Sequence, residues 1–303
     1  MRLVTYLNEA GEARSGVVSG ERIIDLAQGA AAIGKSLPSD IVGLLTLEEA
    51  GLAIAGEVLA HAASNDLPGV PLEGAKLKAA IPQPPTILLL AGNYQSHITE
   101  SGAAPLDKSA ITPRFFIKPR TAMIGTGDAI EIPSVSSTVD YELEIAAVIG
   151  RRGKSIPLAE AESYVAGYAV YNDISARHLT IAQGRKTRHM DDFFDWLNGK
   201  WCDTFSSLGP YLVTRDEIGD PRDLEMSLRV NGTLKQHSAA GEMIFTVPES
   251  IAFISQFITL EPGDIICMGT PGGVGETTQT YLQPGDLVEA EIEKLGLLVN
   301  TVR

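Results

Sequence analysis

The sequence predicts a mainly β protein of the α+β class rather than a doubly wound α/β sheet. From Thr86 onward, short apolar runs alternate with turns that contain glycine and proline, a pattern typical of strands. Helical spacing of apolar residues is limited to short segments, expected at about 159–166, 187–198 and 247–257. Because a doubly wound sheet needs a helix between successive strands, strands with scattered helices favour an all-β or α+β core.

The first part of the chain is predicted to form a small α+β domain. Met1 to Tyr6 and Gly16 to Leu26 have the composition of short strands, and apolar residues at helical spacing follow from Leu45 to Ala63. The stiff, proline-rich segment 81–85 indicates a domain boundary nearby. The predicted limits are 1–72 for the small domain, 73–81 for a linker and 82–303 for the main domain.

The strands of the main domain are bounded by clear turn signals. Asn231-Gly232 is a strong hairpin signal between two of them. Pro-Gly turns at 261–264 and 283–286 each precede another strand. The predicted strands are Ile87 to Leu90, 223–230, 233–237, 265–268 and 287–292.

Composition and charge exclude several classes of protein. Hydrophobic residues make up 44% of the 303 residues and charged residues 20%, which is typical of a globular chain. The formal net charge of −14 provides no basic surface for nucleic acid or an anionic membrane. No apolar run approaches the roughly 18 residues of a membrane span, and the first residues are typical of a strand, not of a signal peptide. We therefore expect a soluble, cytoplasmic enzyme that acts on a small molecule.

The segment 139–150 contains the most informative acidic pattern. Asp140, Glu142 and Glu144 alternate with apolar residues, so a strand would present all three carboxylates on one face. Like charges repel more strongly when partly buried, and a divalent cation would compensate for them. Carboxylates without cysteine select a hard cation such as Mg²⁺, Mn²⁺ or Ca²⁺ over zinc. The alternative is a solvated acidic strand face, and this pattern alone leaves both open.

A fourth acid and a histidine–glutamate pair lie near the ends of other predicted strands. Asp173 ends an apolar strand, where a side chain often points into a site, although it would also suit a turn or a helix cap. His97 and Glu100 are three residues apart and therefore share a helical face. A carboxylate that accepts the imidazole N–H raises the basicity of the ring, which makes His97 a candidate general base. The alternative for this pair is an ordinary contact on a helix surface.

Basic residues and one glycine-rich segment complete the candidates. Lys118, Arg177 and Lys200 could each hold a substrate carboxylate or a developing enolate oxygen, or each could be a surface side chain. The glycine-rich segment 269–275 follows a predicted strand without a clear helix after it. It is therefore predicted to be a tight loop whose backbone approaches a ligand or another strand, not a phosphate loop.

Taken together, these segments resemble the fumarylacetoacetate hydrolase family over about residues 82–303. No single motif is specific, but their number and order make a chance match very unlikely. The matching motifs are Gly92-Asn-Tyr-Gln-Ser-His97 with Glu100, Phe115-Phe-Ile-Lys-Pro119, Asp140-Tyr-Glu-Leu-Glu144, Tyr171-Asn-Asp-Ile-Ser-Ala-Arg177, Gly199-Lys200 with Asp203-Thr-Phe205, Leu208-Gly-Pro210, Thr259-Leu-Glu-Pro-Gly-Asp264 and Gly269-Thr-Pro-Gly-Gly-Val-Gly275.

The resemblance implies a mixed β-roll core, a divalent metal and a homodimer. It assigns the metal carboxylates to Glu142, Glu144 and Asp173, and it assigns the catalytic groups to Lys200 and to a His97–Glu100 pair on a mobile lid. The implied substrate-binding residues are Lys118, Arg177 and Thr270.

The predicted reaction is hydrolysis of a carbon–carbon bond in a β-diketo or acylpyruvate-type 2-oxo acid through a metal-bound enolate. In this mechanism His97 deprotonates the attacking water. The same site would also serve decarboxylation of an oxaloacetate-like acid, or keto–enol isomerisation of 2-oxo and 2-hydroxy-dienoic acids. The remaining alternative is a metal-binding protein without catalytic activity.

Overall fold

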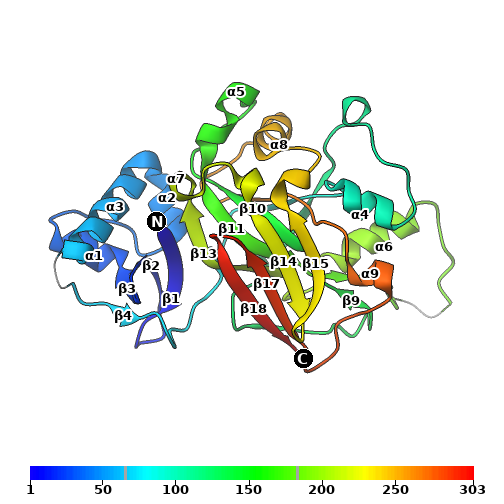
Figure 1. Cartoon of the computed structure of the whole chain (residues 1–303), viewed down its shortest axis with the longest axis horizontal. Coiled ribbons are helices and arrows are strands. Elements are labelled where there is room, and N and C mark those ends of the chain that lie inside the picture. The colour runs from blue at the N-terminus through cyan, green and yellow to red at the C-terminus, as the bar shows by residue number, and fades with distance from the viewer. Residues whose placement is uncertain (65–66, 182–183) are drawn as a thin grey trace.

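The computed structural model describes residues 1–64, 67–181 and 184–303, and the described chain is built on two large β-sheets (Figure 1). One sheet has 11 strands and the other has five. Helices lie mainly at the ends of these sheets, with α1–α3 on one side of the view and α4, α6 and α9 on the other. The α+β, mainly β class predicted from the sequence is confirmed.

The 11-stranded sheet contains strands from both the N-terminal part and the main part of the chain. Its strand order is β4-β3-β2-β1-β13-β11-β10-β16-β5-β6, and β7 also pairs with β13. Its central strands are antiparallel, except that β16 pairs in parallel with β5. The strand bounds are β1 Arg2–Leu7, β2 Ala13–Ser19, β3 Arg22–Asp25, β4 Val70–Pro71, β5 Ile87–Leu90, β6 Phe115–Lys118, β7 Met123–Ile124, β10 Leu143–Ile149, β11 Val165–Asp173, β13 Ser206–Thr214 and β16 Ile265–Cys267.

The N-terminal part joins the main part through this sheet and through a shared core. β1 pairs with β13, with Leu3 opposite Leu212. One buried cluster contains apolar side chains from both parts, among them Leu26, Val58 and Val148. The helices that cover this end are α1 Leu26–Ala32, α2 Ile41–Thr46 and α3 Glu48–Ser64. The domain limits drawn from the sequence stay a prediction, and the structure adds that the two parts share hydrogen bonds and apolar contacts.

The five-stranded sheet has the order β15-β14-β17-β18-β8. The predicted hairpin at Asn231-Gly232 is present, and both residues have positive φ angles of 51° and 74°. The predicted strand 287–292 is found with its alternating pattern, because Val288, Ala290 and Ile292 are buried. The bounds are β8 Ala129–Ile130, β14 Glu225–Val230, β15 Thr233–Ala239, β17 Leu287–Ile292 and β18 Gly296–Val302; a separate pair consists of β9 Val139–Asp140 and β12 Ser175–Ala176.

The predicted helices are present but shorter than expected. The segment expected at about 187–198 becomes helical only at Asp191, because Met190 has a φ of 66° and the Asp191 carboxylate accepts the backbone N–H of Arg188. The helix expected at about 247–257 begins with a capping box between Thr246 and Glu249. The helices of the main part are α4 Gln95–Glu100, α5 Leu158–Ala161, α6 Asp191–Gly199, α7 Arg215–Ile218, α8 Val247–Ile254 and α9 Gly275–Thr278, and the 3-10 turns are Lys108–Ala110, Arg120–Ala122, Glu162–Tyr164, Pro221–Asp223 and Ala240–Glu242.

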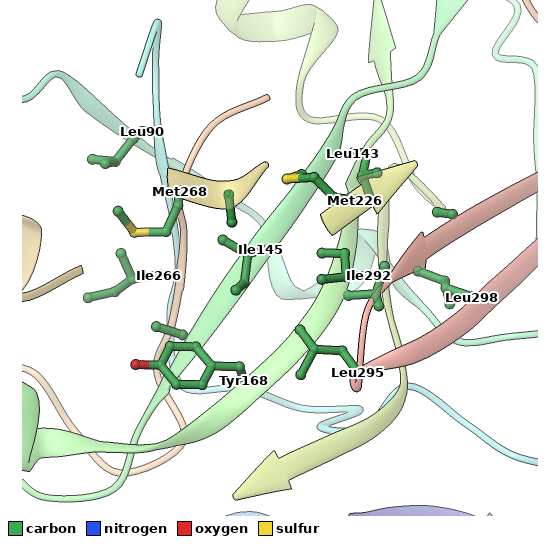
Figure 2. Packing of buried hydrophobic residues seen from close by; sticks show 14 of the residues in the cluster. Leu90, Leu143, Ile145, Tyr168, Met226, Ile266, Met268, Ile292, Leu295 and Leu298 are labelled. Atoms are coloured by element: carbon green, nitrogen blue, oxygen red, sulfur yellow. The ribbon is translucent and has the colours of Figure 1, made fainter. Parts of the chain in front are cut away.

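The main hydrophobic core fills the space between the two sheets (Figure 2). Leu143 and Ile145 of β10 contribute to it together with Met226 of β14, Ile292 of β17 and Leu298 of β18. The next residues along β10, Ala146 and Val148, belong to the cluster on the other face. Burial on both faces explains why β10 is apolar along most of its length and makes its position rigid.

Within the described ranges, the chain has no helix that combines the length and the apolar character needed to cross a lipid bilayer.

Candidate active site and metal centre

Three carboxylates meet where β10 begins and β11 ends. Glu142 and Glu144 are two residues apart and share a face, and the backbone N–H of Asp173 donates to the carbonyl of Glu142 at 2.8 Å. One oxygen from each of Glu142, Glu144 and Asp173 lies within 4.8 Å of the others, and all three residues are buried. We call these three residues the acidic triad.

The strand is interrupted at residues 141–142, between β9 and β10, and amide side chains support the backbone there. Asn172 Oδ1 accepts the N–H of Glu142 at 3.0 Å, and Gln236 Oε1 accepts the N–H of Leu143 at 2.9 Å. Asp140 lies before the interruption and is not part of the triad, although the sequence placed it on the same face. Its carboxylate instead accepts bonds from Arg177 and from the N–H groups of Gly275 and Glu276.

Buried cations compensate two of the three triad acids. Lys200 Nζ lies 2.8 Å from Glu142 Oε2 and 2.7 Å from Asp173 Oδ2. Arg177 pairs with Asp140 and Glu142. Burial opposes ionisation of Glu142, but the charges of Lys200 and Arg177 outweigh it and hold the pKa of Glu142 well below its usual range.

Glu144 is the triad acid without an ion pair among the described residues. Burial, followed by the nearby charges of Asp173 and Glu142, raises the pKa of Glu144 well above its usual value. One of its oxygens accepts the N–H of Gly269 at 2.8 Å. A hard divalent cation among these three carboxylates would remove this repulsion, so the donor set fits Mg²⁺ or Mn²⁺.

Lys118 lies in a different place from the substrate contact expected from the sequence. Its ammonium donates to Asp173 Oδ1 at 2.6 Å and to the backbone carbonyls of Ile174 at 3.0 Å and Phe205 at 2.5 Å. These acceptors use its three N–H groups, and Lys118 does not line the cavity beside the triad. Lys118 therefore holds Asp173 in position and has no donor left for a substrate.

His97 and Glu100 form the expected pair on α4. His97 Nδ1 lies 2.6 Å from Glu100 Oε1, and the other carboxylate oxygen of Glu100 accepts the N–H of Gly273 at 2.6 Å. An ionised carboxylate only accepts hydrogen bonds, so in the neutral imidazole Nδ1 carries the proton and Nε2 carries the lone pair. The side chain of His97 is 26% exposed and lines the cavity beside the triad.

The glycine-rich loop 269–275 connects the triad with the His97–Glu100 pair. Besides the bonds from Gly269 to Glu144 and from Gly273 to Glu100, Gly272 donates to Ser96 Oγ at 3.2 Å. Gly273 has a φ of 101°, and an added Cβ would lie 2.3 Å from the carbonyl oxygen of Lys235. The sequence predicted a close approach of this backbone to a ligand or another strand. The structure shows an approach to β15 at Lys235, together with hydrogen bonds to the side chains of the site.

The triad and His97 line one cavity of about 220 Å³, and Glu100 lies behind His97 outside its lining. Thr270 lines it too, and its hydroxyl accepts the side-chain N–H of Gln236 at 2.8 Å. The residues around the cavity are Leu90, Ala91, Gly92, His97, Arg114, Phe116, Glu142, Glu144, Asp173, Arg177, Trp196, Lys200 and Thr270. Sequence reasoning missed Arg114, Trp196 and Gln236, because no local pattern distinguishes them from surface or core residues.

Comparison with known proteins adds independent information. A family model described as "Fumarylacetoacetate (FAA) hydrolase C-terminal" matches residues 86–303. The Bos taurus protein named "Oxaloacetate tautomerase FAHD2B, mitochondrial" is 39% identical over 286 residues, which cover 94% of this chain and 85% of the relative.

Solved structures of similar proteins cover the whole chain. One is maleylpyruvate hydrolase from Sphingobium sp. SYK-6 in complex with manganese(II) ion and pyruvate, with a TM-score of 0.76, 29% identity and coverage of 100% of this chain and 98% of that one. Another is 2-hydroxyhepta-2,4-diene-1,7-dioate isomerase from Mycobacterium marinum, with a TM-score of 0.71, 29% identity and coverage of 100% and 98%.

Proposed function

Because the chain belongs to the fumarylacetoacetate hydrolase family, as its sequence resemblance predicted, we propose that it interconverts the keto and enol forms of an oxaloacetate-like 2-oxo acid. The observation that carries this proposal is that one cavity is lined both by the acidic triad and by a histidine with a free ring nitrogen. The bovine oxaloacetate tautomerase, similar over 94% of this chain, supports this reaction in particular.

The proton transfer is assigned to His97. Its Nε2 accepts a proton from the carbon next to the 2-oxo group, and the resulting imidazolium gives this proton to the carbonyl oxygen to form the enol and regenerate the base; the reverse sequence returns the keto acid. Glu100 fixes the ring through Nδ1 and stabilises the imidazolium that forms. Lys200 supplies positive charge beside the oxygen that becomes negative during the transfer.

Glu142, Glu144 and Asp173 would hold the divalent cation, with Mg²⁺ or Mn²⁺ favoured over Ca²⁺, and the bound cation supplies Lewis-acid stabilisation of negative charge on substrate oxygens. The manganese complex of the Sphingobium enzyme supports the binding of a divalent metal. Arg177 and Thr270 line the cavity and are the proposed contacts for the 2-oxo acid end of the substrate.

Carbon–carbon bond hydrolysis of an acylpyruvate is the second candidate, and the Sphingobium maleylpyruvate hydrolase supports it. Here His97 Nε2 takes a proton from water as the water oxygen attacks the distal carbonyl. The carbon–carbon bond then breaks, and the electron pair goes to the carbon that becomes the methyl group of pyruvate after protonation. Both candidates need the same base, so product identity distinguishes them.

The test is product analysis by NMR with the purified protein and Mg²⁺ or Mn²⁺. Oxaloacetate should equilibrate between keto and enol forms faster than with metal alone, whereas acetylpyruvate with water should give acetate and pyruvate if the protein is a hydrolase. Release of carbon dioxide from oxaloacetate would identify a decarboxylase. Metal-dependent thermal stabilisation without any of these reactions would indicate the non-catalytic alternative and overturn the proposal.

We also propose that the protein is a homodimer. Exposed apolar side chains gather on and beside α6, including Phe193, Phe194 and Trp201 with exposed fractions of 48%, 52% and 42%, and such patches are typical of interfaces. Light scattering on the purified protein tests this.

The cytoplasmic location predicted from the sequence stays a prediction, because the similar bovine protein is named as mitochondrial. Imaging of the tagged chain in its host cell tests the location.

A further inference from the structure

One cation on the wall of the site cavity has no acidic partner. Arg114 immediately precedes β6 and is exposed. Across residues 1–64, 67–181 and 184–303, its guanidinium makes no hydrogen bond and no ion pair. The two other cations that line this cavity are committed, since Arg177 binds Asp140 and Glu142 and Lys200 binds Glu142 and Asp173.

Arg114 also lines a second hollow of about 150 Å³ that adjoins the site cavity. The two hollows share Leu90, Ala91, Gly92 and Arg114 as lining residues. The second hollow is otherwise largely apolar, with Ile98 and Leu106 among its walls. A substrate held at the triad can therefore extend along Gly92 toward Arg114 without meeting another acidic group of the lining.

We propose that Arg114 binds a distal carboxylate and thereby selects dicarboxylic 2-oxo acids over monocarboxylic ones. This inference rests on the proposed function and adds to it the residue that selects a dicarboxylic substrate. A guanidinium binds a carboxylate through two parallel N–H donors, a geometry that few other side chains offer. The chain carries a net charge of −14, which repels a substrate with two negative charges. Binding of such a substrate therefore needs a nearby cation that is not already paired with an acidic side chain.

The test compares two ligands that differ only at the distal end. Calorimetry on the Mn²⁺-loaded protein measures Kd for 2-oxoglutarate and for 2-oxopentanoate, in which a methyl group replaces the distal carboxylate. The native protein should prefer the dicarboxylate by about tenfold or more. Arg114→Gln should bring the ratio of the two Kd values close to one, and Arg114→Lys should keep part of the preference because the charge remains.

Arg120→Gln is the matched control. Arg120 is exposed and lies in the 3-10 turn after β6, but it does not line the cavity. This variant should keep the native ratio. A ratio that is unchanged in Arg114→Gln, or that falls equally in Arg120→Gln, would overturn the assignment of Arg114. Circular dichroism shows whether each variant is folded.

Oxalate separates failure of this inference from failure of the proposed function. Oxalate has two carbons and can occupy only the 2-oxo acid end of the site. If oxalate binds the Mn²⁺-loaded protein and Arg114→Gln leaves the dicarboxylate preference intact, only the role of Arg114 is wrong. If neither oxalate nor 2-oxoglutarate binds, the proposed site and the role of Arg114 are overturned together.

Discussion

The two halves of the site are built in opposite ways. Glu144 and Asp173 of the acidic triad lie on long strands buried on both faces, Glu142 immediately precedes one of these strands, and all three residues are buried. The His97–Glu100 pair lies on α4, a helix of six residues with no buried residue and no side-chain cap at its N-terminus. A helix this short is marginal by itself, so tertiary contacts must hold it in place.

This difference indicates a division of labour between charge and proton transfer. Carboxylates that bind a metal ion must lie at fixed distances from one another, and rigid strands hold them at these distances. A proton-transfer group needs access to the substrate, and a short helix without buried residues provides that access. The glycine-rich loop 269–275 is bonded to both halves and is the structural link between them.

The largest effect is expected in the triad, from Glu144→Gln. This change keeps the shape and an oxygen that can accept the Gly269 N–H, but it removes one of the three negative charges. We expect turnover to fall more than about 10⁴-fold, because the metal site loses its charge balance and the Lewis acid with it. Kinetics with Mn²⁺ and metal binding by calorimetry measure both consequences.

The same variant tests the electrostatic explanation without any metal. The raised pKa of Glu144 reflects burial beside two other carboxylates, so removing the charge should raise the melting temperature of the metal-free protein. Added Mn²⁺ should stabilise the native protein and not the variant. A metal-free variant that is less stable than the native protein would contradict this account of the triad.

The next effect concerns the proton-transfer half, in His97→Ala. Turnover should fall about 10²–10⁴-fold, the usual contribution of a positioned base. Affinity for Mn²⁺ should remain close to native, because His97 is not among the triad carboxylates. His61→Ala on α3 is the control for loss of a histidine, and it should leave kcat unchanged. Equal loss of metal affinity and turnover in His97→Ala would contradict the division between the halves.

A smaller effect is expected in the connecting loop, from Gly273→Ala. The added Cβ would meet the carbonyl oxygen of Lys235 at 2.3 Å, so the loop must shift and the bond to Glu100 must lengthen. We expect a loss of about 1–3 kcal/mol in the free energy of unfolding, together with a lower kcat. Chemical denaturation and kinetics measure the two losses.

Gly285→Ala separates the clash from backbone strain. Gly285 has a φ of 96°, close to the 101° of Gly273, but an added Cβ there would meet no atom within 4 Å. It should therefore show the stability cost of the positive φ without the loss of kcat. If both variants lose the same amount of activity, the loop does not couple the halves.

Local patterns in the sequence predicted the residues whose geometry depends on near neighbours. Strand alternation placed Glu142 and Glu144 on one face, and helical spacing brought His97 to Glu100. The sequence could not predict the interruption of the strand at residues 141–142 that separates Asp140 from the triad, since Gln236 supports the backbone there from 93 positions beyond Leu143.

Lys118 and Arg114 show the same limit for charges. Arg114 precedes β6 and Lys118 is its last residue. Lys118 is paired with Asp173, 55 positions away, whereas Arg114 lines the cavity without an acidic partner among the described residues. Only the tertiary structure distinguishes a lysine that positions a carboxylate from an arginine available to a ligand.

The smallest expected effect concerns Asp264, a buried acid that belongs neither to the acidic triad nor to the His97–Glu100 pair. It therefore shows what burial alone does to a carboxylate in this protein. It precedes β16, and its backbone carbonyl accepts the N–H of Ile149 at the end of β10 away from the triad. Burial raises the pKa of Asp264 to about 6 from 3.8, with no cation or metal site to oppose it among the described residues. The folded state therefore binds the proton more tightly, so the free energy of unfolding should fall as the pH rises from about 4 through about 6. Between pH 5 and pH 7 this group should lower the free energy of unfolding by about 1 kcal/mol.

In Asp264→Asn the amide oxygen can still accept the N–H of Glu261, so this part of the pH dependence should vanish without loss of the turn. Urea denaturation of both proteins across this range measures the difference, and parallel curves would show that burial alone does not make an acid costly here, which would also weaken the same explanation for Glu144.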